Sequence, residues 1–150
     1  LMEIGSHLVT RTVDKLAEGN YTTIEQMHID EATLKPAPKI FKEDGRINWN
    51  RNAEDIHNLV RGLSPYPAAW TPIYKDGAEC GSAKIFTTRF ELCDHNFQPG
   101  TLKSDGRTYL AVAAADGWVY IEEMQMAGKR RMAIKDILLG WRLSNEVFQK

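Results

Sequence analysis

The chain has 150 residues, of which 43% are hydrophobic and 26% charged, as in an ordinary globular domain. It contains no run of about 18 apolar residues, which excludes a membrane-spanning helix, and its net charge of −1 excludes a strongly basic domain. The charge is uneven: of 19 basic and 20 acidic side chains, residues 1–35 hold three and six, which leaves 16 and 14 for residues 36–150.

Residues 1–19 are predicted to form an amphipathic helix. Its apolar residues recur at spacings of three and four, so they share one face. They are Met2, Leu8, Val9, Val13 and Leu16. Gly19 and Asn20 tolerate a left-handed backbone and are expected to end the helix. Because one helix cannot bury its own stripe, we expect it to dock on the rest of the chain, on another copy or on a domain outside this sequence. Position 1 is Leu rather than Met, which indicates a fragment of a longer chain.

Residues 20–47 are predicted to be an interdomain linker. The stretch from Tyr21 to Asp30 has no clean period, and Pro36 and Pro38 bias the backbone to an extended path. A turn is expected at residues 43–46. We therefore divide the chain into a terminal helix (1–19), a linker (20–47) and a C-terminal domain (48–150).

A second helix is predicted from about Asn52 to Arg61, with Asn50 or Asn52 as its N-terminal cap. Gly62 is expected to end it, and the prolines that follow forbid its continuation. Its expected buried face consists of Ala53, Ile56, Leu59, Val60 and Leu63.

From Trp70 onward the pattern changes to strands separated by compact turns. Strands are expected at residues 70–74, 82–92, 100–102, 109–114 and 118–124, and a last helix at about 133–142. The predicted fold is mainly β with flanking helices: a small oligonucleotide-binding-type (OB-like) barrel preceded by a helix and an extended linker.

Several short motifs occur in a fixed order. They are Ala37-Pro38-Lys39-Ile40, Gly45-Arg46-Ile47-Asn48-Trp49, Gly62-Leu63-x-Pro65-x-Pro67-x-Ala69-Trp70-Thr71, Asp116-Gly117, Gly128-Lys129-Arg130-Arg131-Met132 and Asp136-x-Leu138-x-Gly140. Their order and spacing resemble the C-terminal half of the methionyl-tRNA formyltransferase family, over residues 1–142. The family often has Asp where this chain has Asn48, so a structural role is expected there rather than an ionic one.

This resemblance implies a parent enzyme that moves a formyl group from 10-formyltetrahydrofolate to the methionine amino group of initiator tRNA in the cytoplasm. It also implies a missing N-terminal formyltransferase domain, of which residues 1–18 resemble the last helix. The family's catalytic Asn, His and Asp belong to that domain, and its marker stretch is not found here. We therefore expect no catalytic, cofactor-binding or metal-binding residue in this chain.

The histidines fit that expectation. His95 is the nearest to a catalytic histidine by composition, since Asp94 and Asn96 adjoin it, but it lies in a predicted loop and is interpreted as solvated. His57 is interpreted as a helix-surface residue. Cys80 and Cys93 lack metal-site spacing and are interpreted as thiols in a reducing cytosol.

The candidate nucleic-acid-binding residues are basic. Lys129, Arg130 and Arg131 form the densest cluster and suit phosphate oxygens, although such a loop can also serve solubility alone. Lys39, Lys42 and Arg46 are spaced along the linker and could follow a phosphate backbone.

Other side chains are weaker candidates. Lys84 and Arg89 lie an odd number of positions apart on one strand, so they are expected on opposite faces. Three aromatic residues are available for base stacking by type: Tyr109, Trp118 and Tyr120. The other tryptophans, Trp49, Trp70 and Trp141, are expected in the core.

Three functions remain open on this evidence. The first is a tRNA-binding portion of the parent enzyme that contacts the tRNA backbone. The second is the barrel of a formyltransferase acting on a nucleotide sugar or another small molecule. The third is a structural or oligomerisation module, for which residues 1–19 offer a self-association surface.

Overall fold

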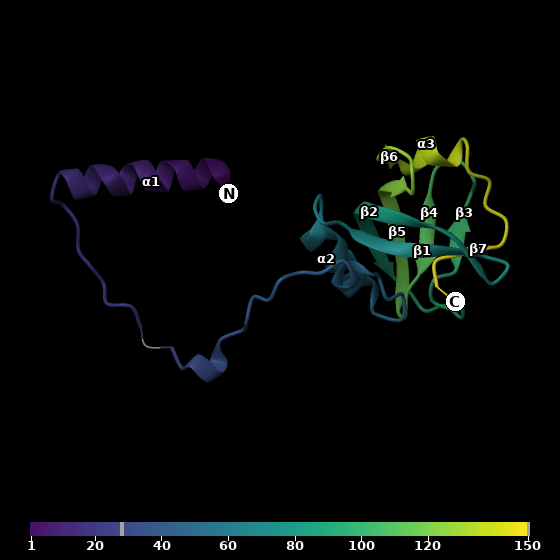
Figure 1. The fold of residues 1–150 in the computed structure, drawn as a ribbon, viewed down its shortest axis with the longest axis horizontal. Coiled ribbons are helices and arrows are strands. Elements are labelled where there is room, and N and C mark those ends of the chain that lie inside the picture. The colour runs from purple at the N-terminus through teal and green to yellow at the C-terminus, as the bar shows by residue number, and fades with distance from the viewer. Residues whose placement is uncertain (28, 150) are drawn as a thin grey trace. The chain divides into compact units, whose positions relative to one another are not determined.

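The computed structural model describes residues 1–27 and 29–149 (Figure 1). It consists of two compact units, Leu1–Pro38 and Lys39–Lys150. The second unit therefore begins nine residues before the boundary expected at residue 48. Buried Gly45 and Ile47 explain the difference, because the N–H of Ile47 donates to the carbonyl of Trp70 at 2.8 Å and joins this segment to the barrel.

The first unit contains α1 (Met2–Ala17) and a short 3-10 turn (Glu31–Thr33). The helix ends as expected: Gly19 has φ +69°, and the N–H of Asn20 donates to the carbonyl of Lys15 at 3.0 Å. The apolar stripe of α1 is exposed. No helix in the described part of the chain is long and apolar enough to cross a membrane.

The second unit is built on one antiparallel sheet, flanked by α2 (Ala53–Leu63) and α3 (Ile134–Leu138). Its strands are β1 (Ala69–Lys75), β2 (Ala78–Leu92), β3 (Leu102–Ser104), β4 (Leu110–Ala113), β5 (Gly117–Met126), β6 (Met132–Ala133) and β7 (Glu146–Val147). The order is β3-β4-β5-β2-β1-β7, with β6 paired to β5.

The sheet closes nearly into a barrel. β7 pairs with β1 at one end of the order, and Val147 also bridges Thr101, directly before β3 at the other end. The helices α2 and α3 pack against the sheet, α2 mainly on β2 and α3 on β5 and β6 (Figure 1). The predicted mainly β fold with an OB-like barrel is confirmed.

The core fills the barrel and the contact with α2. Trp49, fully buried, donates its indole N–H to the Thr71 hydroxyl at 3.0 Å, and Thr71 in turn donates to the carbonyl of Phe148 at 3.1 Å. The rings of Trp49 and Phe148 lie 5.8 Å apart. This buried polar chain satisfies its donors and joins the segment that precedes α2, at Trp49, to β1 and to the C-terminal segment.

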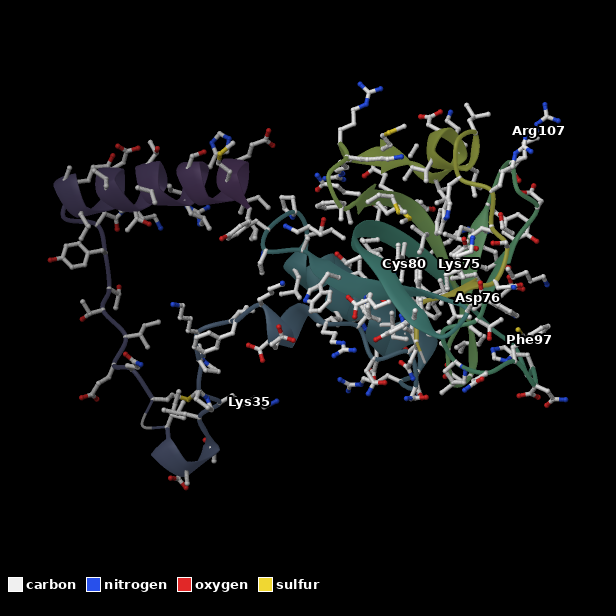
Figure 2. The ribbon with its side chains drawn as sticks, turned by 45° about the vertical axis from the view of Figure 1, so that its right-hand side comes forward. Lys35, Lys75, Asp76, Cys80, Phe97 and Arg107 are labelled. Carbon is white, nitrogen blue, oxygen red and sulfur yellow. The ribbon has the colours of Figure 1, made fainter. Side chains whose placement is uncertain are left out.

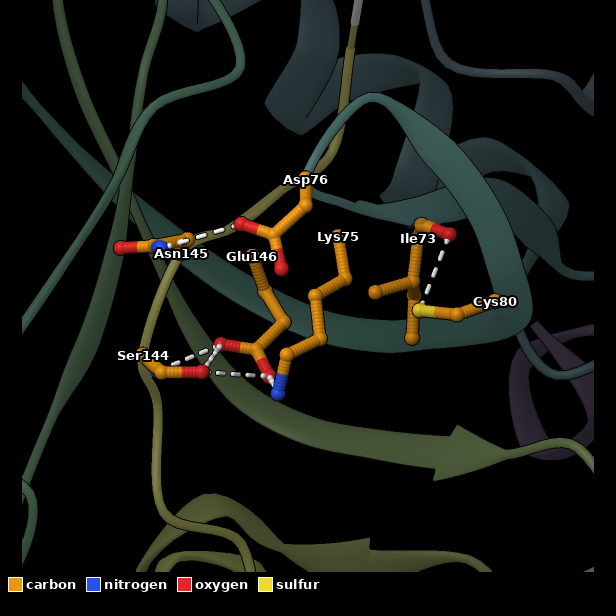
Figure 3. A network of polar contacts seen from close by, with 7 residues as sticks. All are labelled: Ile73, Lys75, Asp76, Cys80, Ser144, Asn145 and Glu146. Atoms are coloured by element: carbon orange, nitrogen blue, oxygen red, sulfur yellow. Dashed lines mark hydrogen bonds and ion pairs between the residues drawn. The ribbon is translucent and has the colours of Figure 1, made fainter.

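The C-terminal segment that contains β7 was not predicted. Glu146, whose side chain is 7% exposed, pairs with Lys75 at 3.3 Å and accepts from Ser144 (Figure 3). The Asn145 amide donates to Asp76 at 3.0 Å. These contacts lie on the β1–β2 hairpin, where Lys75, Asp76 and Cys80 are labelled in Figure 2. A strand of two residues has too little periodicity to be read from sequence.

The prediction for the second helix is partly wrong. Its buried face is as expected, but Gly62 lies inside it and the helix ends at Leu63. Neither predicted Asn forms a side-chain cap; instead the Asp116 carboxylate accepts from the N–H of Ala53 at 2.7 Å. The last helix is also shorter than expected: it begins at Ile134, because Met132 and Ala133 pair with β5 as β6, and it ends at Leu138 rather than at about residue 142.

The expected separation of Lys84 and Arg89 is wrong as well. β2 contains register shifts against β5 between Ile85 and Thr88. These shifts invert the alternation of side chains, so that Ile85 and Thr88 are both buried while Lys84 and Arg89 are both exposed. The two cations therefore lie on the same outer face.

Candidate nucleic-acid interface

A groove of about 680 Å³ opens on the surface of the barrel unit. Three segments distant in sequence line it: the stretch before the Glu43–Gly45 turn, the turn between α2 and β1, and the paired ends of β2 and β5. Its lining residues are Ile40, Phe41, Lys42, Tyr66, Pro67, Ala68, Trp70, Glu79, Ser82, Lys84, Gln125, Met126, Ala127 and Gly128.

Trp70 lies in this groove with Lys42, and its ring is also close to Arg46, which lines a separate hollow. Its indole N–H donates to the carbonyl of Lys42 at 2.8 Å. The Lys42 ammonium lies 5.2 Å and the Arg46 guanidinium carbon 5.8 Å from the centre of the ring. The 3-10 turn Glu43–Gly45 thus gathers these cations on one aromatic surface, whereas an extended path would have spaced them apart. Trp70 is half-buried, not a core residue.

Lys39 is placed next to the same groove. Its ammonium lies 5.4 Å from the centre of the Phe41 ring, which lines the groove. The backbone N–H of Phe41 donates to the Asp44 carboxylate at 2.7 Å. All three predicted linker cations therefore stand beside aromatic rings on or next to one groove.

The predicted basic loop borders the other side of this groove. Gly128, with φ +74°, lines the groove, and the Gln125 amide donates to the carbonyl of Lys129 at 2.7 Å. Lys129 and Arg130 are exposed and line a neighbouring hollow of about 200 Å³, which shares Met126 with the groove. Within residues 1–27 and 29–149, neither forms an ion pair.

Arg131 has a different environment. Its guanidinium pairs with Glu123 and lies 4.4 Å from the centre of the Phe86 ring. The hydrogen bond from Arg131, followed by one from Thr87, holds the pKa of Glu123 below its ordinary value. Since Arg131 already has a carboxylate partner, it is less available to phosphate than Lys129 and Arg130.

Two groove residues were missed by sequence reasoning. Lys84 lies opposite Gln125 on β5 and is exposed in the groove. Tyr66 is 86% exposed on the turn before β1. The two prolines around Tyr66 signalled a turn, but only the fold shows that this turn faces the linker and the end of β5.

The aromatic residues proposed for base stacking lie elsewhere, on the outer face of β4 and β5. Trp118 is only 5% exposed and packs with Ala111 and Ala113 in a small second cluster. The Arg89 guanidinium carbon lies 3.7 Å from the centre of the Tyr120 ring, and the Lys103 ammonium lies 5.2 Å from that of Trp118. Burial, with a hydrogen bond to Glu91, raises the pKa of Tyr120. The rings of Tyr120 and Trp118 are therefore each covered by a cation of the same chain.

His95 and His57 both make contacts within the fold. The ring of His95 contacts the carbonyl of Gly117 at 2.9 Å and packs on Trp118 at 4.9 Å, so it is half-buried rather than solvated. His57 contacts the Thr88 hydroxyl at 2.9 Å. Asn48 has the structural role expected of it, since its side-chain oxygen accepts from the N–H of Asn50 at 3.1 Å. In the described residues no group of three or more His, Cys, Asp or Glu could hold a metal ion.

The barrel unit is thus a small OB-like barrel that carries an aromatic groove with cations in and beside it. The chain belongs to the family of formyl transferase C-terminal domains, whose model matches residues 39–142. The match begins at the first residue of the barrel unit.

The chain is similar to proteins called methionyl-tRNA formyltransferase. It is 42% identical to that of Parabacteroides distasonis over 95% of this chain and 44% of the relative. It is 40% identical to that of Phocaeicola vulgatus over 97% of this chain and 45% of the relative. The chain therefore spans less than half the length of these curated relatives.

Solved structures of HypX from Aquifex aeolicus share the fold. One, of a substituted variant, matches with a TM-score of 0.60 at 16% identity and covers 91% of this chain and 24% of that one. The structure of HypX in complex with tetrahydrofolic acid has a TM-score of 0.60 at 14% identity, covering 95% of this chain and 26% of that one. At such identities the likeness concerns the fold alone.

Proposed function

We propose that this chain is the tRNA-binding portion of a methionyl-tRNA formyltransferase, which formylates the methionine of initiator tRNA from 10-formyltetrahydrofolate. In this proposal the chain binds the tRNA backbone, and the formyl-transfer groups lie in a separate N-terminal domain. Family membership supports the enzyme class, and the names of relatives about 40% identical favour tRNA over a nucleotide sugar as substrate.

The observation that carries the proposal is the set of exposed cations around one groove. Lys39, Lys42 and Arg46 stand on the linker side, and Lys129 and Arg130 on the loop side. Phosphate oxygens are the common partner for such a set, because binding releases the counterions condensed on the nucleic acid. The near-neutral net charge predicts modest affinity, with a fall on the order of tenfold to a hundredfold between 50 and 200 mM salt for a few phosphate contacts.

The test removes the loop cations. We expect Lys129→Ala with Arg130→Ala to weaken tRNA binding and to lower the slope of log affinity against log salt by about 1.8, since each duplex phosphate contact contributes about 0.9. Fluorescence anisotropy with labelled tRNA at several salt concentrations measures both quantities. Because both side chains are exposed, the urea midpoint should not change.

A matched control removes the same charge elsewhere. Arg107→Ala with Lys135→Ala replaces two exposed cations that do not line the groove or the neighbouring hollow. This variant should bind tRNA like the unaltered chain. If the two double variants weaken binding equally, the effect is net charge alone and the proposed surface is wrong. If neither does, the third function, a structural module, is favoured.

A further inference from the structure

The groove contains aromatic surface that the fold itself does not use. Tyr66 is 86% and Phe41 61% exposed. Tyr66 forms neither a side-chain hydrogen bond nor an aromatic contact with the rest of the described chain. The backbone beneath it is nevertheless held, because the N–H of Ala68 donates to the carbonyl of Leu63 at 2.9 Å and Ala68 adopts φ +71°. Two exposed aromatic rings that line the same groove form the kind of exposed apolar surface that marks a binding site.

The polar groups of the groove suit the remaining parts of a nucleotide. Lys42 and Lys84 supply two ammonium groups against one carboxylate, that of Glu79. The Gln125 side chain uses its N–H to hold Lys129, which leaves its carbonyl oxygen to accept a hydrogen bond. The Ser82 hydroxyl can donate or accept. Together these groups match a phosphate and the polar edge of a base.

The size of the groove and its place on the surface restrict the kind of ligand that it can bind. Its volume of about 680 Å³ lies within the range of small-ligand sites. A paired base cannot enter it, because both faces and the pairing edge of such a base are occupied in the duplex. An unpaired base has a free face and is commonly bound on aromatic side chains. A polypeptide occupant would not need the excess of cations.

We propose that this groove binds one unpaired nucleotide of the RNA, with its base against Tyr66 and Phe41 and its phosphate on Lys42 and Lys84. The proposal rests on the proposed function, and adds that a single-stranded position of the RNA is recognised besides the duplex backbone. Lys129 and Arg130, in the neighbouring hollow, would then contact phosphates next to that nucleotide.

The experiment compares a six-nucleotide single-stranded RNA containing 2-aminopurine with the same strand in a blunt duplex. The intact chain should quench the 2-aminopurine of the single strand. Tyr66→Ala should weaken single-strand binding about tenfold, within the usual range for one stacked base, and leave duplex binding unchanged. Tyr66→Phe should retain most of the affinity and Tyr66→Leu should not, because stacking needs the ring rather than apolar area.

Phe97→Ala is the matched control. Phe97 is 53% exposed on the loop after β2 and contacts His95 and Trp118, outside the groove (Figure 2). This variant should bind both RNAs like the unaltered chain. If Tyr66→Ala and the unaltered chain bind the single strand equally, or if no quenching occurs, the nucleotide proposal is wrong and a polypeptide becomes the better candidate.

The experiments distinguish a failure of the proposed tRNA-binding function from a failure of the proposed nucleotide site. If Lys129→Ala with Arg130→Ala weakens tRNA binding while Tyr66→Ala has no effect on the single strand, only the nucleotide site is wrong. If Tyr66→Ala weakens the single strand while the loop variant leaves tRNA affinity intact, only the phosphate contacts of the loop are wrong. If neither variant has an effect, both proposals are wrong.

Discussion

At the scale of single residues, carboxylates hold distant parts of the barrel unit together. Glu146 shows this best, since it lies on β7 and pairs with Lys75 on β1. Burial opposes its negative charge, but hydrogen bonds from the backbone of Ser144 and of Glu146 itself, together with Lys75, hold its pKa below the ordinary 4.5. A carboxyl with a lowered pKa in the folded state stabilises that state only while it is ionised.

The lowered pKa of Glu146 determines how its contribution to stability depends on pH. The contribution of Glu146 is complete above pH 4.5 and is lost as the pH falls through its lower pKa in the folded chain. Glu146→Gln should lower the free energy of unfolding by about 1 kcal/mol at pH 7, and by less as the pH drops below 4.5. Urea unfolding at pH 7 and pH 3 measures this difference. The exposed Glu122→Gln should cost little at either pH, and an equal loss from Glu146→Gln at both would contradict the assignment.

At the scale of elements, the N-terminus of α2 depends on a hairpin 63 residues away in sequence. Asp116 lies between β4 and β5, where the N–H of Ala114 donates to the carbonyl of Gly117 at 2.9 Å. Gly117 is required there, because a Cβ would stand 2.2 Å from the carbonyl oxygen of Glu91. This tight turn brings the Asp116 carboxylate to the end of the helix, where a negative charge also suits the helix dipole.

Loss of this cap should be measurable. Asp116→Ala should destabilise the chain by about 1 kcal/mol, the usual value of an N-terminal cap, and Asp116→Asn by less, because the amide oxygen can still accept. Urea unfolding followed by tryptophan fluorescence gives the free energies. Asn52→Ala is the control, since Asn52 makes no side-chain hydrogen bond to the helix, and its change should be small. A larger effect of Asn52→Ala would restore the cap predicted from sequence.

At the scale of the whole molecule, the chain is two units of different character. The barrel unit has a continuous core that includes α2 and the C-terminal segment, whereas α1 contributes no buried residue. A helix that buries nothing adds little to the stability of a domain. Whether its apolar stripe docks on another copy stays a prediction from the sequence.

Removal of the first unit tests this division. A chain of residues 39–150 should unfold with the same midpoint as the full chain, because the core is complete without residues 1–38. If the stripe mediates self-association, the full chain should sediment as an oligomer and the shortened chain as a monomer. Leu8→Glu with Val13→Glu in the full chain should also abolish association. A lower midpoint for residues 39–150 would show that the first unit is part of the cooperative fold.

Much of the fold could be predicted from the sequence because it is local. The period of α1, the strand-forming residues from Trp70 to Tyr74, and the turn at Ala115-Asp116-Gly117 each depend on neighbouring residues. For the candidate site, residue type and spacing singled out cations such as Lys42 and Lys129, and their contact with nucleic acid stays a prediction. The sequence did not point to Tyr66, because a tyrosine between two prolines looks the same whether its side chain lines a groove or only belongs to a turn.

By itself, the sequence determined the family, the mainly β class, the amphipathic first helix and the basic character of the loop at residues 129–131. Only the tertiary structure decided that Lys42 and Gly128 line one groove, that Arg131 is paired with Glu123, and that Lys84 and Arg89 share a face. The physical reason is that helical and strand periods arise from neighbouring residues. Contacts, caps and bulges instead depend on side chains that meet only when distant segments have packed.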